Sequence, residues 1–186
     1  MPNSTPFGYT EMYIFYDAAT KVIAVYFGKS TTSAEMLSVF RQFLVDFGKW
    51  LPNGRVEEWY TDGGPEFSGE CLEAFCREIA TRRRFIAPWN PWMNVSETGW
   101  RVILRPLRII LAASNVSRRL WPFAVAAIVR IHNALSSASS TIEPENLLSA
   151  FLSSLSSAKS PSPPPSPWFA MTGEASDLSH VRVFFF

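Results

Sequence analysis

The order of apolar and polar residues in the first third of the chain predicts a β-hairpin followed by a helix. Residues 12–17 (MYIFYD) and 21–27 (KVIAVYF) are runs of β-branched and aromatic residues separated by a three-residue turn. Across 32–47 apolar residues recur every three or four positions, as on one face of an amphipathic helix. Thr32 and Glu35 have the spacing of a capping box at its start.

A strand–helix–strand pattern follows. Gly48 is expected to end the first helix, and 55–61 to form a third strand. Ser68 is expected to cap a second helix, and 83–87 to form a short strand. The apolar stripe predicted for this second helix consists of Cys71, Leu72, Phe75, Cys76 and Ile79.

The second half of the chain predicts two more helices and then changes character. Residues 96–113 and 117–135 have helical periodicity, after a loop at 88–94 rich in Pro, Trp and Asn. Residues 136–167 are dominated by Ser and Pro, which favours an extended linker. We therefore expect a domain over 1–135, a Ser/Pro-rich linker over 136–167 and a C-terminal tail over 168–186.

Composition and charge limit the class of protein. Apolar residues make up 47% of the 186 positions, so the chain can bury a sizeable core. No apolar run is long enough to span a bilayer and no secretory signal is present, so we expect a nuclear or cytoplasmic protein with no membrane partner. Residues 71–135 hold ten Arg and three Glu (+7), whereas 1–70 carry −4 and 136–186 carry −2. A basic middle segment is typical of a protein that binds phosphates.

Two acidic residues lie next to the ends of predicted elements. Asp62 follows the third strand within the sequence TDGGPEF, and a carboxylate at the carboxyl end of a strand is well placed to hold a metal. Glu97 comes after 34 intervening residues, behind the sequence APWNP and at the start of a helix. Taken singly, Asp62 also fits a turn former and Glu97 an ordinary first-turn acid favoured by the helix dipole.

In this order and spacing, the motifs resemble the catalytic domain of retroelement integrases. There, a Thr-Asp-Asn-Gly-Gly-Glu-Phe turn supplies the second catalytic acid and an Ala-Pro-Tyr-x-Pro loop leads to the third. Residues 120–125 (LWPFAV) resemble the family's Phe-Trp-x-x-Ala-Val helix, and His132-Asn133 falls where its Leu-Asn-Arg is found. Residues 167–173 (PWFAMTG) and 177–184 (DLSHVRVF) are similar to a segment of copia-type retrotransposon integrases. The resemblance covers nearly the whole chain outside the Ser/Pro-rich insert.

This resemblance implies an α/β fold of the RNase H-like integrase core and Mg²⁺-dependent polynucleotidyl transfer in DNA integration. Asp62 and Glu97 match two of the three carboxylates that hold Mg²⁺ or Mn²⁺ in the family, where two ions clamp the attacking and leaving oxygens. DNA is the implied partner, and a homo-oligomer is compatible with the family. The candidate contacts to the DNA backbone are Arg82, Arg83, Arg84, Arg101 and Arg105.

The sequence departs from the family at the first acid. In the family this Asp lies on the opening strand, just before a Gly-Pro, and the present chain begins with Met1-Pro2, roughly where that Gly-Pro would end. Asp17 matches instead an acid in the turn after the family's second strand, so we do not expect it to bind metal. We therefore expect an incomplete core, with its first, central strand missing and the neighbouring strands unpaired. Whether the chain is an enzyme stays open.

Further departures surround Glu97. The loop that leads to it, Asn94-Val95-Ser96, is one residue shorter than in the family. Gly99 and Pro106 both weaken the predicted helix, Pro by about 3 kcal/mol in a helix interior. These changes favour loss of catalysis.

Three interpretations of function follow. The favoured one is an integrase catalytic-domain protein related to DNA integration that is inactive in this form. The alternatives are a non-catalytic nucleic-acid-binding module that kept the basic residues, and an expressed relic of a transposable element; an active nuclease completed by Asp17 is disfavoured. The basic run at 82–84 also fits a solvated surface patch. Cys71 and Cys76 are expected to be buried, and the tryptophans at 89, 92 and 100 to pack rather than to stack on bases.

Overall fold

The computed structural model describes residues 5–18, 20–51, 54–61, 63–86, 95–114, 117–137 and 182–185. Its strands are β1 (Glu11–Asp17), β2 (Ile23–Gly28), β3 (Glu58–Thr61), β4 (Arg82–Phe85) and β5 (Arg182–Phe185). Its α-helices are α1 (Ser33–Phe47), α2 (Glu70–Glu78), α3 (Val95–Ala113) and α4 (Trp121–Ser137). Three short 3₁₀ helices are η1 (Gly48–Trp50), η3 (Pro65–Phe67) and η5 (Arg118–Leu120).

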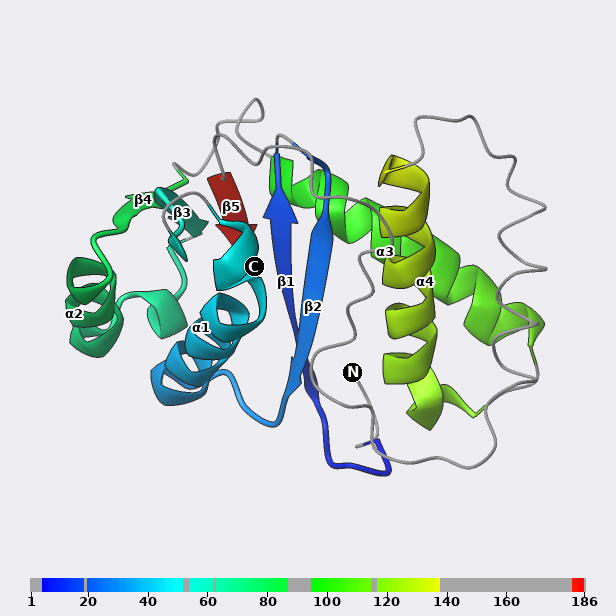
Figure 1. Ribbon diagram of the computed structural model, residues 1–186. Coiled ribbons are helices and arrows are strands. Elements are labelled where there is room, and N and C mark those ends of the chain that lie inside the picture. Colours follow the sequence, from blue (N-terminus) through cyan, green and yellow to red (C-terminus); the bar gives the residue numbers. More distant parts are fainter. Residues whose placement is uncertain are drawn as a thin grey trace.

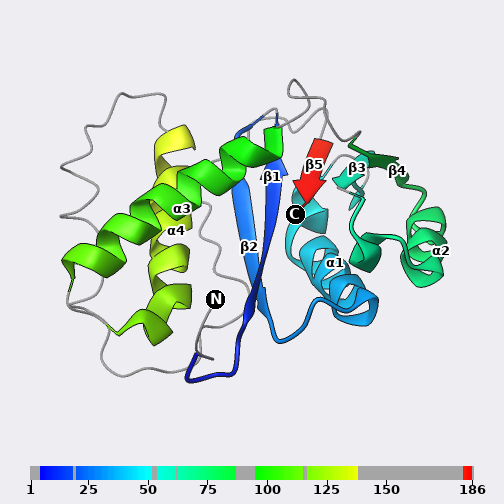
Figure 2. The ribbon, with the colours of Figure 1, turned by 180° about the vertical axis from the view of Figure 1, so that it is seen from behind.

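The strands form one mixed sheet in the order β2-β1-β5-β3-β4. Helices α1 and α2 lie on one side of it and α3 and α4 on the other (Figures 1 and 2). The predicted hairpin is confirmed as the antiparallel pair β1–β2, and β3 and β4 pair in parallel. The α/β class that the sequence predicts is therefore confirmed.

Strand β1 is buried on both faces because two separate hydrophobic clusters meet on it. Alternate side chains of a strand point to opposite faces, so Phe15 belongs to the cluster under α1 and α2, and Ile14 to the cluster under α3 and α4. Strand β2 follows the same alternation and completes both clusters. This arrangement explains why residues 12–17 are almost uniformly apolar instead of alternating with polar residues.

The cluster under α1 is dominated by aromatic rings. The Phe15 ring stacks on Phe43 at 4.3 Å between centroids and meets Trp59 edge-on at 5.6 Å. Phe40 also meets Trp59 edge-on, at 4.4 Å. Because Phe15 is in β1 and Trp59 in β3, these rings connect the two halves of the sheet through side chains as well as through the backbone.

Several details at the helix ends differ from the sequence prediction. Thr32 caps α1 as predicted, but the Glu35 carboxylate accepts hydrogen bonds from the Lys29 amide and the Ser30 hydroxyl instead of closing the capping box. Helix α1 ends at Phe47 with Gly48 as its C-cap, as predicted, and Gly48 has right-handed helical angles and begins η1. The residue that caps α2 is Gly69, and the prediction that Ser68 caps it was wrong.

The prediction that both cysteines of α2 are buried was half wrong. Cys76 is buried with Leu72 and Phe75 against α1, whereas Cys71 is exposed. Five residues correspond to a rotation of about 140° from Cys71 to Cys76, since each residue advances about 100°. One helix face therefore cannot bury both thiols.

The central strand of the sheet comes from the C-terminal end of the chain. β5 pairs antiparallel with β1, Phe15 opposite Phe185, and parallel with β3, Trp59 opposite Val183. In the described part of the chain no strand precedes β1. The expectation that the strands beside the central position are left unpaired was wrong, because β5 occupies that position.

A buried asparagine attaches α4 to the free edge of β2. The Asn133 side chain accepts a hydrogen bond from the Ile23 amide at 2.9 Å and donates one to the Ile23 carbonyl at 2.7 Å. The side-chain amide thereby satisfies both backbone groups of Ile23, as a further strand would. Asn133 is only 6% exposed, so water has little access to replace it.

Replacing Asn133 by alanine is expected to lower the free energy of unfolding by about 2 kcal/mol, because two buried backbone groups of Ile23 lose their partners. Asn133→Asp should be at least as harmful, since a carboxylate cannot donate to the Ile23 carbonyl and brings a charge into the core. Chemical denaturation followed by circular dichroism measures both changes. Arg130→Ala, at an exposed position of α4, is the control, and a loss below about 0.5 kcal/mol for both Asn133 variants would contradict this account.

Candidate functional site

The two predicted catalytic acids belong to two elements, the end of β3 and the start of α3. Strand β3 ends at Thr61, directly before Asp62, which lies outside the described residues. Glu97 is the third residue of α3, and its side chain also lies outside what the structure describes. The predicted loop at 88–94 also lies outside the described residues.

A row of residues across the sheet shows where the first turn of α3 lies. Tyr16 of β1, Phe184 of β5 and Tyr60 of β3 stand side by side in the registers of the two strand pairs. A side chain added at Gly99 would meet the Tyr16 Cβ at 3.4 Å, so α3 lies directly on this row. Two strand spacings amount to about 10 Å, which is the separation expected between Tyr16 and Tyr60 along the row. Gly99, in the first turns of α3, therefore lies at the β1 end of this row, and Tyr60 at its β3 end immediately precedes Thr61.

Gly99 and Pro106 both fit within α3 as the structure shows it. Gly99 is buried against Tyr16, and a Cβ at this position would make only ordinary van der Waals contact with the Tyr16 side chain. The helix continues through Pro106 from Val95 to Ala113. Trp100 is half-buried against the cluster under α3 and α4, as the packing interpretation of the tryptophans predicts.

Other acids near the row have structural roles. The Asp17 carboxylate accepts hydrogen bonds from the Thr20 amide and hydroxyl, which fixes the β1–β2 turn. Strand β5 contains Arg, Val and two Phe, so the central position brings no carboxylate. Among the side chains that the structure describes, no three His, Cys, Asp or Glu residues come together in a way that could hold a metal.

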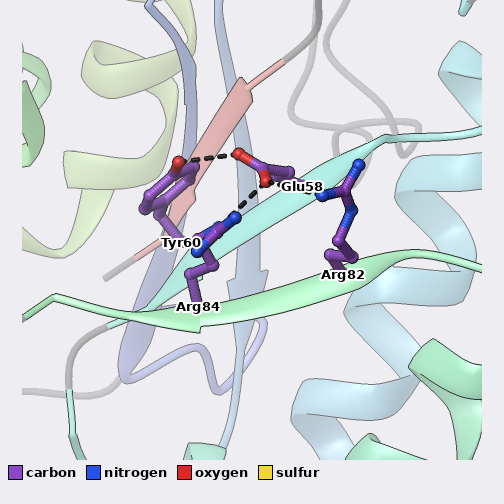
Figure 3. A network of polar contacts seen from close by, with 4 residues as sticks. All are labelled: Glu58, Tyr60, Arg82 and Arg84. Carbon is purple, nitrogen blue, oxygen red and sulfur yellow. Dashed lines mark hydrogen bonds and ion pairs between the residues drawn. The ribbon is translucent and has the colours of Figure 1, made fainter.

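Three of the five predicted DNA-binding arginines form strand β4 at the edge of the sheet. Arg82 and Arg84 are opposite Glu58 and Tyr60 of β3, and both arginines point towards Glu58 (Figure 3). The Arg84 Nε donates to the Glu58 Oε1 at 2.9 Å, and an Arg82 nitrogen lies 3.9 Å from the same oxygen. The Tyr60 hydroxyl donates to the other carboxylate oxygen at 2.7 Å.

The environment of Glu58 stabilises its ionised form. Hydrogen bonds from Tyr60 and Arg84 lower the pKa of the Glu58 carboxyl below its ordinary value, and the charge of Arg82 acts in the same direction. The Glu58 side chain is 12% exposed, whereas Arg82 and Arg84 are 76% and 51% exposed. Two exposed guanidinium groups thus share one largely buried carboxylate, which leaves a net positive charge on this edge.

The remaining candidate arginines lie elsewhere. Arg83 points to the opposite face of β4 from Arg82 and Arg84, towards α2. Its guanidinium carbon lies 4.4 Å from the centroid of the Phe85 ring. Arg101 and Arg105 are exposed and one turn apart on α3, with Arg108 in the next turn on the same face. Helix α3 packs over β1 and β5 while β4 is an edge strand, so the candidate arginines come from two separate elements.

The sequence prediction missed the residues that orient the β4 arginines. Glu58 and Tyr60 are two positions apart in a strand, as are Arg82 and Arg84, so each pair shares a face. The match between a Glu/Tyr pair and an Arg/Arg pair, each at period two, was a usable signal only once β3 and β4 were assumed to be parallel neighbours. The predicted start of β4 at residue 83, one position late, also left out Arg82.

The fold is that of retroviral integrase catalytic cores. The chain aligns with the HTLV-2 integrase catalytic core domain in complex with magnesium (trimeric form) at TM-score 0.50 and 18% identity, over 72% of this chain and 78% of that one. It aligns with the BIV integrase catalytic core domain at TM-score 0.52 and 14% identity, over 78% and 87%. It also aligns with a simian T-cell lymphotropic virus intasome in complex with PP2A regulatory subunit B56 gamma at TM-score 0.55 and 16% identity, over 94% and 56%.

These likenesses confirm the α/β, RNase H-like integrase-core class that the motifs predict. Identities of 14–18% show the fold alone. Neither a protein-family model nor a curated protein sequence matches the chain. No helix in the described ranges is both long and apolar enough to cross a membrane.

Glu58→Gln is expected to change how stability depends on pH. The folded-state pKa of Glu58 lies below its unfolded value of about 4.5, so its contribution is fully present above that pH and is lost as the pH falls through the folded-state pKa. The wild-type chain should therefore be more stable than Glu58→Gln at neutral pH, and the difference should shrink below about pH 4.5. The free energy of unfolding of both proteins is measured with denaturant between pH 3 and 7, in steps of about one pH unit. Exposed Glu78→Gln on α2 is the control, and a difference independent of pH would count against the ion pairs.

Proposed function

We propose that this chain is an integrase-core domain related to DNA integration that binds DNA and does not carry out strand transfer by itself. The single observation that carries the second half of the proposal is the identity of the central strand. The central strand of the sheet lies next to β3, whose end precedes Asp62. Here the central strand is β5, and its residues are Arg, Val and Phe. An integration-related fold is thus combined with an incomplete set of acids.

Asp62 and Glu97 are the residues proposed to hold Mg²⁺ or Mn²⁺. The position of Gly99 against Tyr16 supports this, because it brings the first turn of α3 over the row that ends beside Thr61. Carboxylates are the ligands that such hard cations prefer, and magnesium accompanies the HTLV-2 core. When bound, the metal would polarise phosphate oxygens.

Two carboxylates are fewer than the three that the resemblance implies for strand transfer. Phe184 lies in the middle of the row between Tyr16 and Tyr60, and it cannot ligate a metal. Asp17, the nearest acid on β1, is held by Thr20. The arrangement therefore supports weak metal binding without efficient catalysis.

DNA binding is proposed for the arginines on two elements. Arg82 and Arg84 exceed the charge of Glu58 by one unit, and Arg101 and Arg105 lie on the exposed face of α3. Both groups suit contacts to phosphates, which do not depend on base sequence. A homo-oligomer and a nuclear or cytoplasmic location, as well as descent from a copia-type element, belong to the same proposal.

In a disintegration assay with Mn²⁺ or Mg²⁺, the purified chain is expected to form no strand-transfer product, because the sheet centre carries no acid. Asp62→Asn and Glu97→Gln should then be indistinguishable from the wild type. Circular dichroism of each sample confirms that the protein is folded. Product formed by the wild type and lost in both variants would refute the proposed inactivity and show a complete metal site.

The affinity for duplex DNA is expected to fall steeply with salt, because binding releases counterions. The double variant Arg82→Ala/Arg84→Ala should reduce the slope of log K against log [salt] by about two if each arginine contacts one phosphate. Arg77→Ala is the matched control, since Arg77 is an exposed arginine on α2 that pairs with Glu73. Fluorescence anisotropy at several salt concentrations provides the slopes.

Two further variants separate a DNA contact from a structural ion pair. Glu58→Gln should tighten DNA binding, since it frees two guanidinium groups from their shared carboxylate. Arg101→Ala/Arg105→Ala tests the α3 group in the same way. If none of these variants changes the slope or the affinity, the arginines are structural and the interpretation as a transposon relic gains support.

A further inference from the structure

The strand at the centre of the sheet is connected to the rest of the described fold only across a long stretch of sequence. Helix α4 ends at Ser137 and β5 begins at Arg182, so residues 138–181 connect them. The composition of 136–167 predicts a linker, and linked partners are held at effective concentrations on the order of millimolar. β5 is therefore comparable to a ligand that is supplied by the same chain.

The pairing of β5 is short on both sides. It meets β1 over Phe15–Asp17 and β3 over Glu58–Thr61. The β1–β2 pair extends over six residue pairs, from Glu11 to Tyr16. Fewer residue pairs therefore join β5 to each neighbour than join the two strands of the hairpin.

The two strands that flank β5 are also joined by side chains. Phe15 of β1 and Trp59 of β3 are in contact, and Phe40 of α1 packs on Trp59. Strands β1 and β3, which flank the central position, are thus in contact with each other through side chains that do not belong to β5.

The edges of β1 and β3 that face each other determine which kind of segment can pair between them. If β5 leaves, the facing edges of β1 and β3 present unpaired N–H and C=O groups, which pair readily with an extended segment. The registers require a segment parallel to β3, with one residue opposite Trp59 and the next between Tyr16 and Tyr60. Val183 and Phe184 meet both requirements, and every copy of this chain carries them.

We propose that the position between β1 and β3 is a strand-acceptor site that holds Arg182–Phe185 in a releasable way and exchanges it for the same strand of a second copy of the chain. The exchange of an identical element is a low-cost route to a closed dimer. In dilute solution the strand of the same chain wins, because its effective concentration exceeds that of any other copy. This site is independent of the proposed function in DNA binding.

The test uses the full chain with a specific protease site introduced into residues 160–166. Unlabelled and ¹⁵N-labelled chains are mixed at micromolar concentration and cut, so that the tether no longer favours the original partner. Native mass spectrometry is expected to show that each C-terminal fragment stays bound after cutting. After incubation, it should also detect unlabelled N-terminal fragments bound to ¹⁵N-labelled C-terminal fragments. An excess of a peptide with the sequence of residues 179–186 should displace the pieces, and the same peptide with Val183→Asp and Phe184→Asp should not.

Two results of the cutting experiment would overturn the proposal. One is immediate loss of the piece with an unchanged thermal transition, which would show that the central position needs no strand. The other is a bound piece that neither mixes between copies nor yields to the peptide, which would show permanent pairing.

Native-state hydrogen exchange on the uncut chain tests the same point where cutting causes precipitation. The amides of residues 183–185 should exchange through an opening that leaves the Tyr13 and Tyr26 amides of the hairpin protected. Equal protection of both sets, following global unfolding, would overturn the proposal. DNA affinity measured on the same samples distinguishes a failure of this site from a failure of the proposed function.

Discussion

The simultaneous pairing of β5 with β1 and with β3 is the interaction on which the rest of the architecture depends. These two pairings join the antiparallel hairpin β1–β2, which α3 and α4 cover, to the parallel pair β3–β4, whose strands are connected through α2. A gap at this place would expose two strand edges in the middle of the protein, and buried backbone groups without partners are strongly disfavoured. The aromatic contact between Phe15 and Trp59 spans the same place, so backbone and side chains fix the same alignment of the two halves.

This alignment also determines the chemistry that is available. Because Phe184 stands between Tyr16 and Tyr60, the centre of the row is apolar and aromatic. Of the two acids proposed for metal binding, Asp62 follows β3 directly in the sequence and Glu97 belongs to the first turn of α3. A strand taken from the tail restores the hydrogen bonding of the sheet without restoring an acid there. Structural completion and catalytic completion are thus separate properties of the central strand.

The sequence predicted local elements well and long-range partners poorly. Periodicity alone located the hairpin and α1, since Phe15 and its neighbours alternate while the apolar residues of α1 recur at helical spacing. It could not place β5, because nothing within Arg182–Phe185 specifies a partner more than 100 positions away. The role of Asn133 escaped for the same reason, as its two hydrogen bonds reach back to Ile23. Motif order identified the fold where periodicity could not, because it combined short matches from distant parts of the chain.

At the β4 edge, one group of charges forms ion pairs and is also the group proposed to bind DNA. Arg84 is fixed by its hydrogen bond to Glu58, and Tyr60 fixes the carboxylate from the other side, so the guanidinium orientation is largely determined before any partner arrives. Exposed ion pairs contribute little to stability, and Arg82 at 3.9 Å and 76% exposed contributes less than Arg84. A phosphate that approaches this edge meets more positive than negative charge, and it does not have to break the Glu58–Arg84 hydrogen bond to reach Arg82. Binding and ion pairing therefore compete only in part, and the basic edge of the sheet is compatible with both.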